Sequence, residues 1–257
     1  MTDGSGVEME KRMTEWLREG ERLDDLQRDG LWLIQNPSWF CFGMDAVLLS
    51  AFARVGEGDR VIDLCTGNGV IPILLSARTK GDRFDGLELQ EDIADMAMRS
   101  VRYNRLEDRV EIRQGDVKEA VSLYGAACAQ VVTCNPPYLT ETGGLINPTD
   151  HKAIARHELK LSLAEVIDAA KRLLVSGGRF YMVHRPFRLA EILHGMVEAG
   201  LEPKRLRMVH PHEDKDPNMV LIEGVRGGNS GMVVDRPLVI YKKDGTYTDE
   251  VRELYEG

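Results

Sequence analysis

From residue 60 onward, short apolar segments alternate with amphipathic ones, and this alternation constrains the fold more than any other feature of the chain. Several of the segments typical of strands contain a continuous apolar run, as expected of strands that are buried on both faces. A parallel sheet covered by helices on both sides meets that requirement. The sequence therefore predicts an α/β fold: a doubly wound, mostly parallel sheet of seven strands.

The predicted elements follow one another without an internal repeat. Strands are expected at residues 60–64, 84–89, 110–114, 130–134, 179–184, 201–210 and 218–224. Helices are expected at residues 70–78, 92–103, 163–175 and 189–199. Gly177 and Gly178 are interpreted as the stop of the third helix. Ahead of this series we expect a strand at 31–35 and a helix from Asp45, a residue suited to be its N-cap.

We assign residues 30–225 to one domain and treat residues 1–29 and 226–257 as short extensions at its two ends. The first extension contains a charged stretch, 8–19, with apolar residues at helical spacing, so a short helix is expected there. No apolar run approaches the roughly 20 residues that cross a bilayer, and the polar first residues are unlike a secretory signal. We expect a cytoplasmic protein.

The cysteines and the net charge disfavour several classes of protein. No two of the four cysteines have metal-ligand spacing, so free thiols and no metal site are expected. A net charge of −9 argues against a surface that attracts nucleic acid everywhere. Residues 151–210 nevertheless hold 11 Lys and Arg against 6 Asp and Glu. A local basic face and a merely solvated helix surface are both open on these counts.

Glycine-rich and acidic segments follow the first three core strands. The segment 63–69 reads Asp-Leu-Cys-Thr-Gly-Asn-Gly, and its glycines allow a sharp turn that brings a ligand against the next helix. Glu88 has two oxygens for the hydroxyls of a ribose, and Asp116 is a candidate acceptor for an adenine amine. Singly, each acid is more often a helix cap or a surface charge. Together they predict one cofactor site, to which we assign Asp63, Thr66, Gly67, Asn68, Gly69, Glu88, Leu89, Asp116 and Val117.

This order of features resembles the class I S-adenosylmethionine-dependent methyltransferases over residues 30–225. The resemblance implies a Rossmann-like fold and S-adenosylmethionine as the cofactor. Cys65 is the one departure, because it occupies a position where many members carry a third glycine.

The most specific signal is Asn135-Pro136-Pro137-Tyr138, which ends the fourth core strand. The side-chain oxygen of Asn135 and the carbonyl of Pro136 are suited to accept from the two N–H groups of a planar amine, which favours the reactive pyramidal form. Each proline fixes φ, and Tyr138 offers a flat face to a base or an amide. We assign all four residues to catalysis, Asn135 also to the cofactor and Tyr138 also to the substrate. An ordinary turn is the alternative.

The tetrapeptide resembles two groups of enzymes: adenine-N6-methyltransferases of DNA or RNA, and glutamine-N5-methyltransferases of release factors. The glutamine enzymes carry a helical domain ahead of the core, for which the chain has only about 30 residues. They also carry an acid–proline segment after the tetrapeptide, where this chain reads Leu139-Thr140-Glu141-Thr142. Segments 40–49 and 235–248 resemble the two ends of the tRNA1(Val) (adenine-N6)-methyltransferase family.

That resemblance implies N6-methylation of an adenosine beside the anticodon of a valine tRNA, with tRNA as the partner. Glutamine methylation and a non-catalytic cofactor- or RNA-binding module are the alternatives. We assign Arg185, Arg188, Lys204 and Arg205 to contacts with tRNA phosphates, although surface charges would look the same. The loop 139–161, which holds Lys152, Arg156 and His157, has the length of a lid or binding element. The sequence leaves the oligomeric state open.

Overall fold

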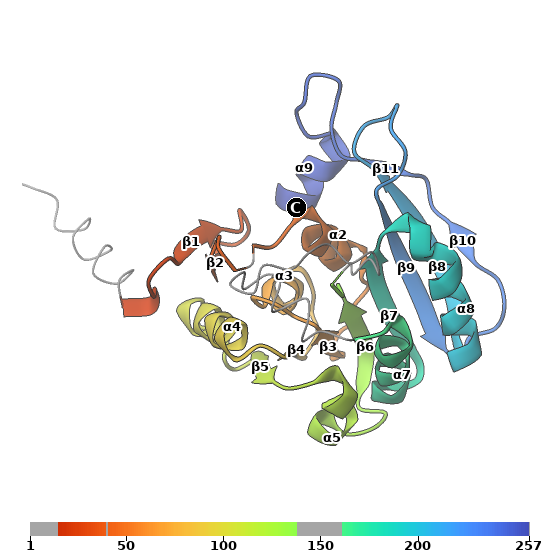
Figure 1. Cartoon of the computed structure of the whole chain (residues 1–257), viewed down its shortest axis with the longest axis horizontal. Helices are drawn as coiled ribbons and strands as arrows, with labels where there is room; N and C mark the ends of the chain where they lie inside the picture. The colour runs from red at the N-terminus through yellow and green to blue at the C-terminus, as the bar shows by residue number, and fades with distance from the viewer. Residues whose placement is uncertain (1–14, 40, 138–160, 257) are drawn as a thin grey trace, which may run out of the picture.

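A nine-stranded sheet forms the centre of the computed structural model, which describes residues 15–39, 41–137 and 161–256 (Figure 1). Its strands are β3 (Arg60–Leu64), β4 (Arg83–Glu88), β5 (Val110–Gln114), β6 (Ala129–Cys134), β7 (Leu174–His184), β8 (Leu201–His210), β9 (Met219–Arg226), β10 (Val233–Val234) and β11 (Leu238–Val239). Among these described residues, no helix has the length and apolar character that a membrane crossing requires.

The strand order β10-β8-β9-β7-β6-β3-β4-β5, with β11 also paired to β8, confirms the doubly wound prediction. The strands β3, β4, β5, β6 and β7 are parallel to one another, and β9 is antiparallel to β7 and β8. The seven expected strands are all present, and the two-residue strands β10 and β11 widen the sheet to nine. The order changes direction between β3 and β6, and ligands of such sheets bind outside the carboxyl ends of the strands at that point.

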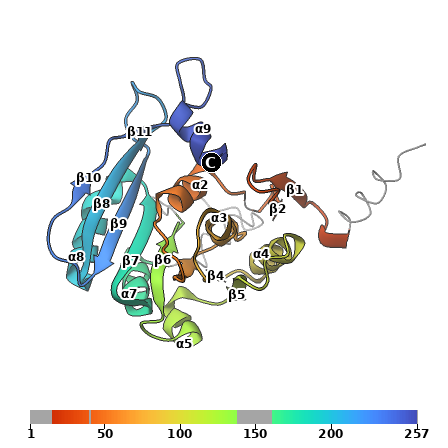
Figure 2. The same cartoon turned by 180° about the vertical axis from the view of Figure 1, so that it is seen from behind.

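Helices cover both faces of the sheet because neighbouring residues of each strand point to opposite sides. Val61 and Tyr181 pack toward α2 (Met44–Phe52), α3 (Val70–Arg78), α4 (Glu91–Tyr103) and α9 (Asp249–Glu256). Ile62 and Phe180 pack toward α5 (Ala120–Tyr124), α7 (Leu163–Leu173) and α8 (Leu189–Ala199). Figures 1 and 2 show α2 and α3 on one side of the sheet and α5 and α7 on the other.

Two expected helix boundaries were wrong. The helix α2 begins at Met44 with Gly43 as its N-cap, so Asp45 lies inside the first turn, where a carboxylate still favours the helix dipole. The helix α7 ends at Leu173 and β7 begins at once, with Gly177 inside it at φ +78°. The pairing of β6 with β7 shifts register at this place, so the two glycines belong to an irregularity of the strand.

The expected strand at 31–35 is present as β2 (Trp32–Gln35), but it lies outside the main sheet. It pairs antiparallel with β1 (Arg22–Asp25), and the resulting hairpin lies beside α4 (Figure 1). Residue 30, where we set the start of the domain, falls between these two strands. The division into one domain and two extensions stays a prediction.

Candidate active site

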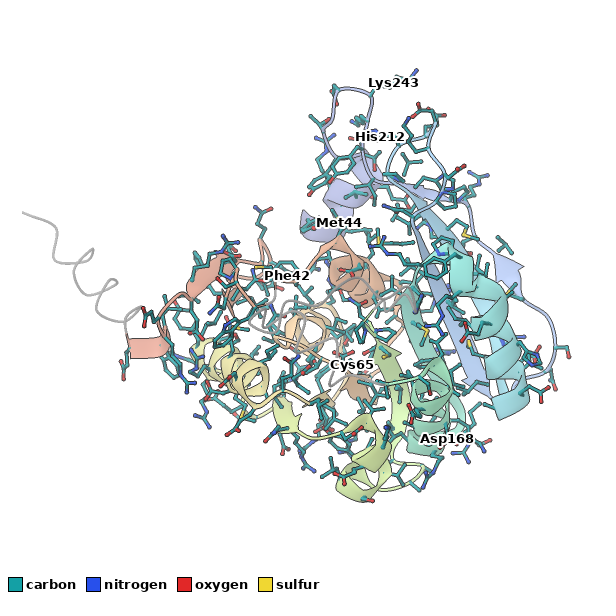
Figure 3. The ribbon with its side chains drawn as sticks, viewed as in Figure 1. Phe42, Met44, Cys65, Asp168, His212 and Lys243 are labelled. Carbon is teal, nitrogen blue, oxygen red and sulfur yellow. The ribbon has the colours of Figure 1, made fainter. Side chains whose placement is uncertain are left out.

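The loop from β3 to α3, residues 65–69, makes a tight turn at the carboxyl edge of the sheet. Cys65, Gly67 and Gly69 have φ angles of +58°, +57° and +81°. Cys65 thus occupies a left-handed conformation that glycine adopts freely and that costs another L-residue about 1–2 kcal/mol. This geometry is one that glycine would adopt without strain, and it shows that cysteine is accommodated. Figure 3 shows Cys65 at the centre of the molecule.

The loop is held against β4. The backbone N–H of Thr66 donates to the carbonyl of Leu87 at 3.0 Å. A Cβ atom at Gly86 would lie 2.9 Å from the hydroxyl of Thr66 and 2.7 Å from Ile112, so only glycine allows this close approach. The loop is therefore fixed beside the end of the second core strand.

Three polar atoms of this segment are buried without a partner in hydrogen-bonding geometry among the described residues: Asp63 Oδ2, Thr66 Oγ1 and Asn68 Oδ1. The other carboxylate oxygen, Asp63 Oδ1, accepts from the Thr133 hydroxyl at 2.6 Å. An unpaired buried acceptor costs about 1–3 kcal/mol. Three of them within six residues indicate a place that a ligand with hydrogen-bond donors or positive charge completes.

Two acids of the site have raised pKa values. Complete burial raises the pKa of Asp63 to about 7, against the opposing effects of the Thr133 and Thr66 hydroxyls. Burial also raises the pKa of Glu88, although the backbone N–H groups of Gln90 and Gly67 oppose it. Those N–H groups donate to Glu88 Oε1 at 3.0 Å and Oε2 at 2.9 Å. Glu88 thus joins the loop after β3 to the start of α4, and a carboxylate keeps further acceptor sites for a ligand.

The remaining predicted cofactor residues lie at the same edge. Asp116 Oδ1 accepts from the N–H of Lys118 at 2.9 Å and caps the short 3₁₀ helix η1 (Val117–Glu119). Val117 is buried in the core below it, whereas Leu89 is half-buried next to Glu88. The capping function is thus observed, and it occupies one of the two carboxylate oxygens.

Asn135, Pro136 and Pro137 follow β6 at the carboxyl edge. Cys134 pairs in register with Leu64, so the first residues after β6 lie beside the first residues of the β3–α3 loop. Pro136 is buried, and Asn135 and Pro137 are half-buried. Tyr138 lies outside the described residues, as do Lys152, Arg156 and His157 of the long loop. The structure thus brings the described part of the predicted catalytic segment together with the predicted cofactor segment.

Only two of the four predicted RNA contacts lie at this edge. Arg185 directly follows β7 and donates to the carbonyl of Asn218 at 3.0 Å, and Arg188 forms an ion pair with Glu191 at 2.5 Å. Between them, the Phe187 ring is 68% exposed. The strand β8 runs in the same direction as β7, so its last residue, His210, lies at this carboxyl edge of the sheet.

The structure does not bring Lys204 and Arg205 to the carboxyl edge. They lie about 20 Å and about 17 Å before the end of β8, at roughly 3.3 Å per residue. Lys204 donates to the carbonyls of Asn229 and Gly231. Arg205 is mostly buried in an ion pair with Glu223 at 2.8 Å and lies over the ring of Phe52. A cluster of basic residues in the sequence does not show at which edge of the sheet those residues lie.

Sequence reasoning missed two residues of the site. Thr133 stands opposite Asp63 in the pairing of β3 with β6, and a threonine in an apolar strand was a usable signal. Gln35, which closes the apolar run of β2, contacts Asn68 of the loop, but its pairing could not be read from the chain. Within the described ranges, no group of three or more His, Cys, Asp or Glu side chains is placed to hold a metal.

Comparisons with known proteins agree with this geometry. A family model described as the methyltransferase small domain matches residues 42–199. A protein of Aeromonas hydrophila named tRNA1(Val) (adenine(37)-N6)-methyltransferase is 30% identical over 213 residues, covering 82% of this chain and 87% of that protein. A protein of Dyadobacter fermentans with the same name is 29% identical over 215 residues, covering 83% and 88%.

Solved structures with the same fold include a predicted O-methyltransferase of Agrobacterium tumefaciens. It superposes with a TM-score of 0.66 at 24% identity and covers 82% of this chain and 95% of its own. TYW2 of M. jannaschii, solved in complex with AdoMet, has a TM-score of 0.55 at 13% identity and covers 82% and 88%. At these identities the two likenesses concern the fold.

Proposed function

Because this chain belongs to the methyltransferase small domain family, we propose that it transfers a methyl group from S-adenosylmethionine to N6 of an adenosine in tRNA, next to the anticodon of a valine tRNA. The observation that carries the proposal is the position of Asn135 and Pro136 beside the β3–α3 loop and its buried, unpartnered acceptors. The names of the relatives support the tRNA substrate. We place this activity in the cytoplasm, together with its tRNA substrate.

The residues at the carboxyl edge fit the cofactor. S-adenosylmethionine carries two positive centres in its methionine part, a sulfonium and an ammonium. The unpartnered oxygens of Asp63, Thr66 and Asn68 are acceptors of the kind that favours such charges. Glu88 stands at the end of the next strand with acceptor sites for the two ribose hydroxyls. Asp116 is suited to the adenine amine through its second oxygen.

The chemistry assigned to the catalytic segment follows from the weak nucleophilicity of the adenine amine, whose lone pair is delocalised into the ring. The cofactor supplies an electrophilic methyl group. Asn135 Oδ1 and the Pro136 carbonyl accept hydrogen bonds from the two N–H groups and favour the pyramidal nitrogen. As its lone pair forms the N–C bond, the bond between the methyl group and sulfur would break with its electron pair left on sulfur. The methylated nitrogen would then lose one of its two protons to water. The prolines fix the backbone so that this carbonyl needs little reorganisation. We assign Tyr138 to stacking on the extruded base.

A panel of acceptors tests the proposal. The purified chain is incubated with methyl-labelled S-adenosylmethionine and, in separate reactions, with bulk tRNA, a translation release factor and DNA. We expect label in tRNA alone. Label in the release factor would make a protein glutamine the substrate. No transfer to any acceptor, with the cofactor still bound, would indicate a binding module.

Arg185 supplies a cation for the RNA at the carboxyl edge, next to the exposed ring of Phe187, on which a base can stack. Arg185→Ala is expected to weaken tRNA binding several-fold and to reduce the slope of log affinity against log salt by about 1. Filter binding at several salt concentrations measures both. Lys204→Ala is the matched control, because it also removes one cation but from the distant half of β8. Equal slopes for both variants would remove Arg185 from the RNA surface.

The raised pKa of Asp63 makes cofactor binding depend on pH. With a pKa of about 7, the carboxyl is partly protonated in the free protein at neutral pH. An ammonium beside it favours the ionised form, so binding releases a proton. The affinity should therefore rise with pH, by up to about tenfold per unit below 7, and level off above it.

Calorimetry with S-adenosylhomocysteine, the product that keeps the ammonium, measures this profile between about pH 5.5 and 8. Asp63→Asn should bind more weakly and lose the rise, whereas the neighbouring Glu88 is unchanged in that variant. A flat wild-type profile would show that Asp63 does not face the ammonium.

A further inference from the structure

Gln35, the last residue of β2, connects the amino-terminal hairpin to the β3–α3 loop. Its side chain is buried, with 2% of the residue exposed. Gln35 Oε1 accepts from Asn68 Nδ2 at 3.1 Å and from the backbone N–H of Phe42 at 2.9 Å. Gln35 Nε2 donates to Asp24 Oδ2 on β1. One carboxamide therefore joins the hairpin, the segment before α2 and the loop; Figure 3 shows Phe42 between the hairpin and α2.

The bond to Gln35 determines which way the Asn68 carboxamide faces. Asn68 is fully buried, and its nitrogen is directed to Gln35. Its oxygen is left without a partner in the part of the chain that the structure describes, as are Asp63 Oδ2 and Thr66 Oγ1. If the Asn68 carboxamide were flipped, its nitrogen, which is a donor, would take the place of its oxygen, which is an acceptor. The orientation therefore decides whether Asn68 attracts or repels a cation.

The hairpin is a firm support for Gln35 because it is fixed to α4 by bonds of its own. Asn104 accepts from the N–H of Trp32 at 2.9 Å and donates to its carbonyl at 2.6 Å. Ser100 Oγ accepts from the N–H of Ile34 at 3.0 Å. Arg99 forms a double hydrogen-bonded ion pair with Glu21, whose side chain is fully buried. These contacts hold β2 against the helix that begins just after Glu88.

We propose that Gln35 is a positioning residue of the cofactor site, which holds Asn68 so that its side-chain oxygen accepts from the ammonium of S-adenosylmethionine. The inference rests on the proposed cofactor. The hairpin of β1 and β2 thereby helps to orient a cofactor-binding side chain, although Gln35 precedes the residues 42–199 that the family model matches. Gln35 itself touches neither the cofactor nor the substrate.

Gln35→Leu tests the proposal, since leucine keeps an apolar side chain of similar size and removes all three bonds. Calorimetry of the full chain with S-adenosylhomocysteine alone, without RNA, should show a Kd raised at least about tenfold, the equivalent of one lost hydrogen bond to a charged group. Ser100→Ala is the matched control, because it removes the hydrogen bond from the N–H of Ile34, which lies on the same strand as Gln35. The Tm should therefore fall while the Kd stays within about twofold.

An exchange variant separates positioning from general stability. Gln35→Glu alone places two carboxylates together and should weaken binding. Adding Asp24→Asn exchanges donor and acceptor between the two side chains and keeps an oxygen for Asn68 and Phe42. It also removes the ion pair of Asp24 with the exposed Arg22 side chain, which lies outside the site and contributes about 1 kcal/mol or less to stability. This double variant should return the Kd to within about threefold of the wild type. The comparison holds even where Gln35→Leu fails to fold.

Three results would overturn the proposal: wild-type affinity in Gln35→Leu, an equal loss of affinity in Ser100→Ala, or no recovery in the folded double variant. A wild-type chain that does not bind S-adenosylhomocysteine would instead overturn the proposed function, and this inference with it.

Discussion

Asn135→Ala is expected to reduce methyl transfer about a hundred- to a thousandfold, the usual effect of removing one hydrogen-bonding group that stabilises a transition state. Asn135 lies after β6, beside the β3–α3 loop, and its side-chain oxygen is the acceptor assigned to the amine. The Kd for the cofactor should stay within a few-fold, since Glu88 and the loop are untouched. Single-turnover kinetics with saturating cofactor measure the chemical step separately from binding.

Asn135→Asp is the matched control for this prediction. Aspartate keeps an oxygen acceptor of the same length, so it should retain far more of the transfer rate than alanine does. The Tm of both variants should stay close to that of the wild type, because Asn135 is only half-buried. Full turnover in Asn135→Ala would show that the side-chain oxygen is not part of the mechanism.

Glu88→Gln is expected to raise the Kd for S-adenosylhomocysteine about a hundredfold, because two charge-assisted hydrogen bonds to ribose hydroxyls are lost or weakened. Both carboxylate oxygens already accept backbone N–H groups, from Gly67 and Gln90. A carboxamide has only one oxygen, so its nitrogen would face one of these donors. Calorimetry at about pH 8.5, above the range in which Asp63 titrates, measures the effect of Glu88 with Asp63 ionised in both proteins.

Glu111→Gln is the control for the loss of negative charge. Glu111 lies on β5 with an exposed side chain that pairs with Arg113, so it is an acid of the same sheet outside the site. Its replacement should leave the Kd unchanged. Equal effects of the two substitutions would mean that Glu88 acts through general charge and not through direct contact with the ribose.

Elements whose signal is local could be predicted closely from the sequence. The strands β3, β5 and β8 and the helices α3 and α8 have the expected bounds. Each has a local signal, which is an apolar run in β3, apolar residues interspersed with polar ones in β5 and β8, and a helical period in the two helices. The location of the site at the carboxyl edge could be predicted from the order of strands and helices, because parallel strands bring the segments that follow them together. For this reason the order of the elements alone was enough to assign Asp63, Glu88 and Asn135 to one edge of the sheet.

Features that depend on long-range pairing could not be predicted in this way. The partner of β2 is β1 and not the main sheet, and nothing in either segment specifies that choice. The contact of Gln35 with Asn68 joins residues 33 positions apart. Arg205 appears in the sequence as one more surface cation, yet the fold buries it against Phe52 and Glu223. Position along a strand, which a charge count ignores, separates it from Arg185.

The most direct test of the central claim is mass spectrometry of nucleosides from tRNA treated with the purified chain and labelled S-adenosylmethionine, with Asn135→Ala treated in parallel. The tRNA is digested both to nucleosides and to fragments that identify the labelled position. We expect labelled N6-methyladenosine beside the anticodon of a valine tRNA with the wild type, and almost none with the variant. Label on another nucleoside, or no label in tRNA while the chain still binds the cofactor, would contradict it.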